Sequence, residues 1–105
     1  MSQVFDALSH PIRREVLELL KRGGLSAGEL ADHFPVSKPT MSGHFAKLKA
    51  ADLIRGESRG GSIVYTLNMS ALEEAVMGFM GRMGVGSGQA APADPATAPA
   101  KEQRA

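Results

Sequence analysis

The most constraining feature of this chain is a pair of short, capped helical segments separated by a tight turn. Ser26 and Glu29 form a capping box, in which the two side chains satisfy backbone N–H groups at the start of a helix. Pro35 ends this helix, because proline has no N–H and disfavours helical geometry in the residue before it. Ser37 is the expected N-cap of the next helix, and Pro39 is tolerated in its first turn. The pattern predicts a helix-turn-helix.

The second of these helices has one apolar and one polar face. Met41, Phe45 and Leu48 recur at the spacing of an amphipathic helix. The opposite face is polar, small and positively biased, and it consists of Lys38, Thr40, Ser42, Gly43, His44 and Lys47. When a helix-turn-helix binds DNA, the second helix enters the major groove and its N-terminal side chains reach the bases. A module for protein contacts is the alternative, and it would show no DNA preference and tolerate Lys38→Glu.

The residues that follow predict a β-hairpin. Residues 53–58 and 62–67 are two short runs, and Arg59-Gly60-Gly61 connects them. A hairpin directly after a recognition helix is the wing of a winged helix. Arg59, beside flexible glycines, is expected to reach a phosphate or a narrow groove. Arg55, on the first strand, is explained equally well as a solvated surface charge.

These positions define a predicted DNA-binding surface. The net charge of the chain is only +1, but residues 36–61 carry five basic and two acidic residues. A stripe of local charge is sufficient to face DNA on an otherwise neutral protein. The residues expected to read or border the major groove are Lys38, Thr40, Ser42 and His44. The residues expected to hold phosphates are Ser37 and Lys47, and Arg59 is expected to anchor the wing.

The segment before the helix-turn-helix predicts a scaffold helix. Pro11 suits the first turn of this helix, and Gly23-Gly24 ends it. Its core stripe is expected to consist of Ile12, Val16, Leu19 and Leu20. Arg13 and Arg14 are assigned to its exposed side, with ion pairs to Asp6 or Glu18 favoured over phosphate contacts. His10 is expected to be a structural residue at the helix start.

A last helix carries more apolar surface than a small domain needs. Ser70 and Glu73 are expected to form a second capping box. The apolar stripe that follows consists of Leu72, Val76, Phe79, Met80 and Met83. Its surplus over what the core of one chain requires predicts a protein partner, because exposed apolar patches of this size mark interfaces. The alternative is that the stripe completes the core of the monomer.

Three stretches of the chain resemble one family of bacterial regulators. The start of an ArsR/SmtB-type winged-helix repressor is similar to VFDALSHPIRREVLELLKRGGLSAGELADHF. The recognition helix of that family is similar to VSKPTMSGHFAKLKAADLI, and its wing return strand to RGGSIVYTLN. The resemblance as a whole covers residues 4 to about 80. The spacing around LSHPIRR, the KPTMSGHF helix and the glycine wing most resembles the small SdpR-like autorepressor subgroup.

The resemblance implies a mainly α-helical winged helix-turn-helix with a small β-hairpin. It implies a homodimer whose interface combines the N- and C-terminal helices. The implied interface residues are Val4, Phe5, Leu8, Leu72, Val76, Phe79, Met80 and Met83. A two-fold dimer places two recognition helices about one DNA turn, roughly 34 Å, apart, and so predicts an inverted-repeat operator. The protein is then expected to repress transcription by occupying a promoter, in one hypothesis its own.

Many members of the ArsR/SmtB family sense metals. This chain lacks the metal-ligand patterns that those members use. One pattern uses cysteines on the first helix of the helix-turn-helix, and this chain has none. Another uses carboxylates and histidines on the last helix, where this chain has Glu73 and Glu74 but no histidine. The histidines lie in different predicted elements. We therefore expect neither metal nor cofactor. Control by a regulatory protein partner is one hypothesis, and a metal- or ligand-responsive regulator of the same fold is the alternative.

Other classes of protein fit this sequence poorly. No nucleophile elbow, P-loop or paired-carboxylate pattern predicts an enzyme. No apolar run approaches the ~20 residues that span a bilayer, and no signal peptide is recognisable, so a cytoplasmic location is expected. Residues 1–83 are assigned to the DNA-binding domain. Residues 84–105 are Gly, Ala and Pro rich and are expected to form a disordered tail.

Overall fold

The computed structural model describes residues 2–84, and its elements have the order of a winged helix-turn-helix. In chain order the elements are α1 (Ser2–Ala7), α2 (Pro11–Leu19), the short 3-10 helix η1 (Leu20–Arg22), β1 (Leu25–Ser26), α3 (Ala27–Ala31), α4 (Lys38–Ala50), β2 (Ile54–Arg59), β3 (Ser62–Leu67) and α5 (Met69–Arg82). The chain divides into two parts, residues 1–72 and residues 73–105. The tail predicted for residues 84–105 lies outside the described residues, except for Gly84.

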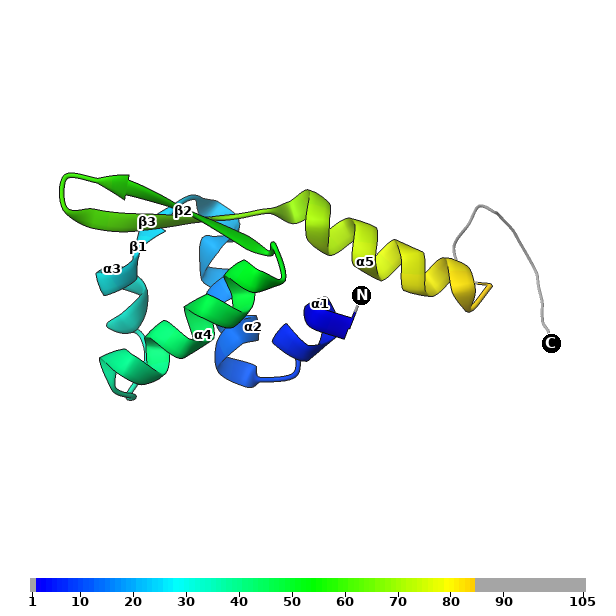
Figure 1. Ribbon diagram of the computed structural model, residues 1–105, viewed down its shortest axis with the longest axis horizontal. Helices are drawn as coiled ribbons and strands as arrows, with labels where there is room; N and C mark the ends of the chain where they lie inside the picture. Colours follow the sequence, from blue (N-terminus) through cyan, green and yellow to red (C-terminus); the bar gives the residue numbers. More distant parts are fainter. Residues whose placement is uncertain (1, 85–105) are drawn as a thin grey trace. The chain divides into compact units, whose positions relative to one another are not determined.

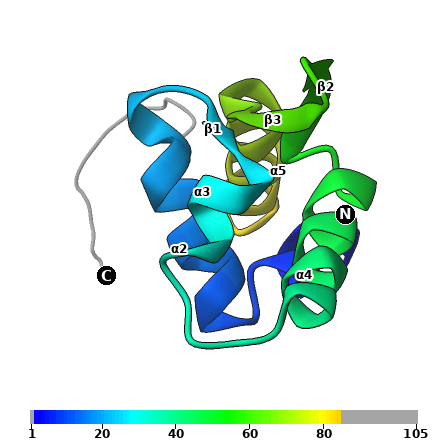
Figure 2. The same cartoon turned by 90° about the vertical axis from the view of Figure 1, so that its left-hand side faces the viewer.

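In the first part, α2, α3 and α4 pack beneath a small antiparallel sheet (Figure 1). The strand order is β1-β3-β2, so the return strand of the hairpin lies in the middle. Figure 2 shows α2, α3 and α4 on the same side of this sheet. Strand β1 is not predicted from the sequence. It consists of only two residues, and it exists because Leu25 pairs with Tyr65 and Ser26 with Val64 on β3.

The predicted caps are present at the starts of α3 and α4. The Ser26 hydroxyl accepts a hydrogen bond from the Glu29 N–H at 3.0 Å, and Glu29 Oε1 accepts one from the Ser26 N–H at 2.8 Å. The Ser37 hydroxyl accepts from the Thr40 N–H at 3.2 Å. His10 caps α2 in the same way, because its Nδ1 accepts from the Ile12 N–H at 3.1 Å. The structural role predicted for His10 is therefore confirmed.

The recognition helix α4 ends in a turn that directs the chain into the wing. The Leu53 N–H donates to the Leu48 carbonyl at 3.0 Å, and the Asp52 N–H donates to the Lys49 carbonyl at 2.8 Å. These two bonds form a Schellman motif, in which the residue after the cap adopts a left-handed conformation. Asp52 has this conformation, with φ of 62°. Aspartate tolerates it better than most side chains.

The wing is the hairpin that the sequence predicts, but its loop is shorter. Strands β2 and β3 pair from Ile54 with Leu67 to Arg59 with Ser62. The loop consists of Gly60 and Gly61 alone, and both have positive φ, of 53° and 87°. Two such residues form the tight turn whose twist matches that of the strands. Arg59 is therefore the last residue of β2 and not part of the loop.

The core of the first part lies between these helices and the sheet. The largest fully buried side chains are Val16, Leu30, Met41, Leu48, Leu53 and Ile54. Phe45 of α4 packs against Tyr65 of β3, with 4.9 Å between their ring centroids. The predicted apolar face of the recognition helix is thus confirmed, because Met41, Phe45 and Leu48 are all buried.

Helix α5 begins two residues earlier than a cap at Ser70 requires. Met69 is already helical, so Ser70 lies inside the first turn and the capping box predicted there is wrong. Asn68 precedes the helix, and its carbonyl accepts a hydrogen bond from the Leu72 N–H at 3.4 Å. The Asn68 amide donates to the Asp52 carbonyl at 2.8 Å, so it connects the end of β3 to the turn after α4. No residue of α5 is buried.

Replacing Ser26 with alanine is expected to lower the free energy of unfolding by about 1 kcal/mol, because both bonds of the capping box depend on the serine. Urea denaturation followed by circular dichroism measures the change. Ser42→Ala is the matched control. Ser42 is exposed inside α4, where alanine has the higher helix propensity, so the control should not lose stability. Equal stability of the Ser26→Ala variant and the wild type would show that the cap does not stabilise the fold.

Candidate nucleic-acid interface

The structure places most of the predicted DNA-contacting residues on exposed surface. The exposed members of the set are Ser37, Lys38, Thr40, Ser42, Lys47 and Arg59. Five of them lie on α4 or cap it, and Arg59 ends the first strand of the wing. A Cβ atom at Gly43 would meet no atom of the described residues within 4 Å, so the helix is open to close approach there. This surface has the polarity and the small side chains that a recognition helix needs.

Two predicted DNA cations carry a carboxylate partner. Lys47 Nζ lies 3.7 Å from an Asp6 carboxylate oxygen, and Arg59 Nη2 lies 3.0 Å from Glu57 Oε1. All four side chains are more than half exposed. Ion pairs exposed to this degree contribute little stability, because water and salt screen them. Both cations can therefore exchange a carboxylate for a phosphate at small cost.

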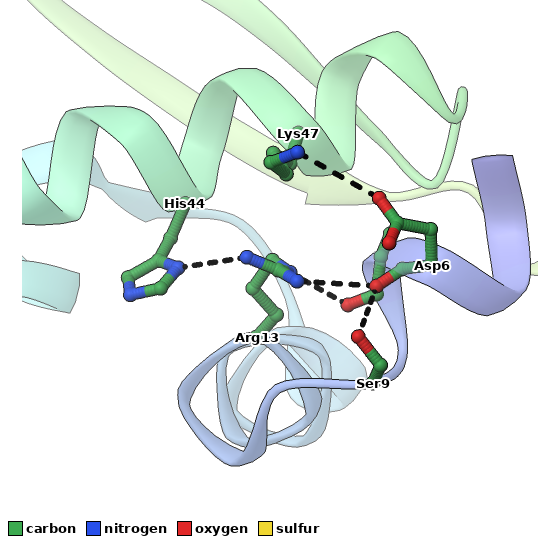
Figure 3. Close-up of polar contacts among 6 residues, drawn as sticks. Asp6, Ser9, Arg13, His44 and Lys47 are labelled. Carbon is green, nitrogen blue, oxygen red and sulfur yellow. Dashed lines mark hydrogen bonds and ion pairs between the residues drawn. The ribbon is translucent and has the colours of Figure 1, made fainter.

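His44 does not lie on the exposed face to which the sequence pattern assigned it. Its residue is only 9% exposed, and its ring turns toward α2. Arg13 Nη1 lies 3.2 Å from His44 Nδ1, and the rings of His10 and His44 are 4.5 Å apart (Figure 3). The assignment of His44 to the DNA-facing surface is therefore corrected. The sequence pattern favoured exposure because histidine is polar. In the structure the buried Arg13 side chain is the hydrogen-bond partner of His44.

The assignment of Arg13 to the exposed side of α2 is also wrong. Arg13 is 7% exposed, and it donates to backbone carbonyls at the end of α1 and not to a carboxylate. The sequence does contain a signal, because Arg13 precedes the buried Val16, Leu17 and Leu20 by three, four and seven residues. That spacing places it on the buried stripe. Arg14 is exposed and donates to the Leu8 carbonyl at 2.7 Å, in place of the expected ion pair.

The surroundings of His44 lower the pKa of its imidazole. The largest cause is burial, which disfavours the charged form, and the electrostatic interactions of the ring with His10 and Arg13 act in the same direction. The imidazole is thus held neutral under conditions in which a solvated histidine begins to gain a proton.

The residues of the implied dimer interface differ in their burial. Val4, Leu8 and Leu72 are half-buried and pack against the core of the first part. Phe5 and Val76 are also half-buried. On the second part of α5, Phe79, Met80 and Met83 are 43%, 37% and 60% exposed. The stripe is thus more exposed toward the end of α5, whereas Leu72 at its beginning packs against the core of the first part.

Within residues 2–84, no three histidine, cysteine, aspartate or glutamate side chains come together as a metal site would require. The structure does bring His10 and His44 together, although the sequence places them in separate elements. The Nδ1 atoms of both rings already have hydrogen-bond partners within the chain. Among the same residues, no helix has the length and apolar character needed to cross a membrane.

Comparison with known proteins supports a role in DNA binding. Residues 8–57 match the family model described as a helix-turn-helix domain. The chain is 43% identical over 76 residues to the transcriptional repressor SdpR of Bacillus subtilis, covering 72% of this chain and 84% of the relative. It is 37% identical over 73 residues to an arsenical resistance operon repressor of Staphylococcus xylosus, covering 70% of each.

Solved structures of transcriptional regulators also resemble this chain. A crystal structure of an ArsR family transcriptional regulator superimposes with a TM-score of 0.74 at 28% identity, covering 79% of this chain and 90% of the other. An ArsR-like transcriptional regulator from a Rhodococcus species superimposes with a TM-score of 0.69 at 32% identity, covering 79% and 77% of the two chains.

Proposed function

This chain belongs to the ArsR/SmtB family of winged helix-turn-helix transcriptional repressors, and we propose that it acts as a homodimer on an inverted-repeat operator. It is a DNA-binding regulator and not an enzyme. The relatives and structural neighbours named above are likewise transcriptional regulators. Within this role, residues 1–83 form the DNA-binding domain and residues 84–105 a tail. The observation that carries the proposal is the exposed, polar and basic face of α4 beside the wing.

In this proposal, α4 enters the major groove and the wing contacts the flanking backbone. Lys38, Thr40 and Ser42 border the bases, because they lie in the first turns of the helix. Lys47 and the cap residue Ser37 contact phosphates, and Arg59 anchors the wing. His44 is left out of the contact surface because it is buried against Arg13.

The proposal of a homodimer rests on the apolar surface of α5. Phe79, Met80 and Met83 remain substantially exposed, and Met77 is 64% exposed. A helix with several large exposed apolar side chains is stabilised when a second copy covers them. Two copies related by a two-fold axis also double the basic surface that faces DNA.

We further propose that repression is independent of metal and acts on the protein's own promoter. The chain offers no thiolate ligand because the sequence has no cysteine. The absence of a three-ligand cluster among residues 2–84 adds to this argument. Relief of repression is then assigned to a regulatory protein partner.

Fluorescence anisotropy with the DNA upstream of the gene tests these proposals, with unrelated duplex as reference, at two salt concentrations and with and without zinc. Tight, salt-dependent binding that zinc leaves unchanged supports a metal-independent autorepressor. Zinc-dependent affinity would make the chain a metal-responsive regulator. Specific binding only to other promoters would remove autoregulation while leaving the repressor role intact.

Replacing Lys38 or Arg59 with alanine is expected to weaken DNA binding and flatten its salt dependence. Removing one cation from a phosphate reduces the slope of log affinity against log salt by about one unit, hence by about two for a dimer. Lys21→Ala is the matched control. It removes one positive charge from η1, beside Leu67 and Leu72, and the proposal assigns no DNA contact to η1. An unchanged slope in Lys38→Ala or Arg59→Ala would show that the residue in question does not contact phosphate.

A further inference from the structure

Arg13 connects three helices through a single side chain. Its Nε donates to the Ala7 carbonyl at 2.7 Å, and its Nη2 donates to the Asp6 carbonyl at 3.1 Å. Its Nη1 lies 3.2 Å from His44 Nδ1. Figure 3 shows the guanidinium between His44 of α4 and the end of α1. The side chain therefore joins α2, which carries it, to both α1 and the recognition helix.

The chemistry of this contact determines the protonation state of His44. A guanidinium has N–H donors and no acceptor, so the Nδ1 atom that faces it must be the acceptor. His44 is then neutral, with its proton on Nε2. A proton on Nδ1 would place two N–H donors opposite each other and a second positive charge beside the guanidinium. The contact therefore exists only while His44 is uncharged.

The two carbonyls held by Arg13 belong to the last turn of α1. The final carbonyls of a helix lack partners within the helix, and a cation there is favourable for them. Asp6 adds a second connection, because its carboxylate lies 3.7 Å from Lys47, one turn after His44 on α4. Arg13 thus holds the end of α1 and the middle of α4 at a fixed separation.

We propose that Arg13 is a positioning residue for DNA recognition, which holds α4 in its DNA-binding position through a hydrogen bond to neutral His44. Protonation of His44 breaks this bond and releases the recognition helix. Sequence-specific binding is therefore lost as the pH falls. This role of Arg13 rests on the proposed function, in which α4 enters the major groove.

The charged and titratable groups near His44 come from α1, from α4 and from the start of α2. His10 and Arg13, before and on α2, repel a proton on the ring. Lys47 lies on α4 itself, and the Asp6 carboxylate of α1 is directed at Lys47. Because the folded-state pKa of His44 lies below its unfolded value of 6.5, the unfolded chain binds the extra proton first. The stability that the neutral His44 contributes to the folded state is fully present above pH 6.5. It is lost as the pH falls from 6.5 toward the folded-state pKa of His44.

The test compares wild type with His44→Asn from about pH 8 to about pH 5, a range that brackets histidine titration. The probe is a duplex that the wild-type protein selects from a random library at the alkaline end. Asparagine places its side-chain oxygen where Nδ1 lies and cannot take up a proton. We expect wild-type affinity to fall by up to about tenfold per pH unit for each protomer, while His44→Asn retains affinity across the range.

The opposite pH dependence would overturn the inference. A histidine that touches phosphate binds DNA better when protonated, so wild-type affinity that rises on acidification would restore His44 as a contact. Parallel profiles of wild type and His44→Asn would assign the pH dependence to other groups. His33→Gln is the control for a histidine away from this contact and should keep the wild-type fall in affinity. His10→Asn removes one of the groups that repel a proton on His44, so the fall should begin at a higher pH. Asparagine at position 10 also preserves the cap of α2.

A second measurement needs no DNA and so separates this inference from the proposed function. Imidazole chemical shifts during a pH titration report the tautomer and the pKa of each histidine. We expect His44 to be protonated on Nε2 when neutral and its pKa to lie below the ordinary histidine value of 6.5. In Arg13→Gln, which removes the positive charge beside the ring, the pKa of His44 should rise. An Nδ1-protonated His44 in the wild type would exclude the hydrogen bond and the inference with it, whatever the affinity for DNA.

Discussion

Replacing Phe79 with glutamate is expected to convert the proposed dimer into monomers and to weaken binding to an inverted repeat on the order of 100-fold or more. Phe79 lies within the apolar stripe of α5, and it is 43% exposed in the single chain. Glutamate there leaves each monomer intact, because no residue of α5 is buried. In a dimer it would bring an uncompensated charge into an apolar interface. Sedimentation velocity and anisotropy on the same samples measure the two effects.

Met77→Glu is the matched control for this prediction. Met77 is 64% exposed on the same helix, but it lies about 160° around the axis from Phe79 at ~100° per residue. An identical new charge on the opposite face should therefore leave dimer and affinity unchanged. If Phe79→Glu remains dimeric at micromolar concentration, or if both variants dissociate equally, the stripe is not the interface.

Replacing Leu48 with alanine is expected to lower the free energy of unfolding by about 2–5 kcal/mol. Leu48 is completely buried in the face of α4 that packs on the core, and its carbonyl also accepts the bond that starts the turn into the wing. Removing its branched end leaves a cavity that close-packed neighbours fill only partly. Urea denaturation with a two-state fit measures the change.

Lys49→Ala is the matched control, because it introduces alanine at a neighbouring but exposed position of α4. Lys49 is the exposed residue that follows Leu48 on α4, so its replacement should change stability by less than about 0.5 kcal/mol. Leu48→Ala should keep wild-type DNA affinity at low temperature, where the variant remains folded. A loss of less than about 1 kcal/mol in Leu48→Ala would show that α4 is not anchored as described.

The features that the sequence predicted well are those that depend on neighbouring residues. The capping box at Ser26 and Glu29 forms because Ser26 directly precedes the first residue of α3, whereas the same spacing at Ser70 and Glu73 gives no box because α5 already begins at Met69. Gly60 and Gly61 define the tight turn of the wing because both must adopt positive φ. The helix-turn-helix and its wing therefore follow from local chemistry, and the family comparison agrees with them.

The features that the sequence pattern missed depend on contacts between distant residues. Arg13 and His44 are 31 positions apart, and the polar side chain of each favours exposure when its own helix is considered alone. An arginine is buried only when acceptors surround its forked donors, and here those acceptors come from α1 and α4. The two-residue strand β1 is a similar case, because only pairing with β3 makes it a strand. Periodicity places Arg13 on the buried stripe, but its charge argues against burial.

The proposed reading of successive major grooves by two copies of α4 requires both half-sites to lie on one face of the DNA. Its most direct test compares the affinity for a selected inverted repeat with that for the same half-sites moved apart by about five base pairs, half a helical turn. The insertion turns one half-site to the opposite face of the duplex. The two-fold dimer predicts a loss of affinity on the order of 100-fold, because only one half-site is then engaged. Equal affinity for the two duplexes would contradict it.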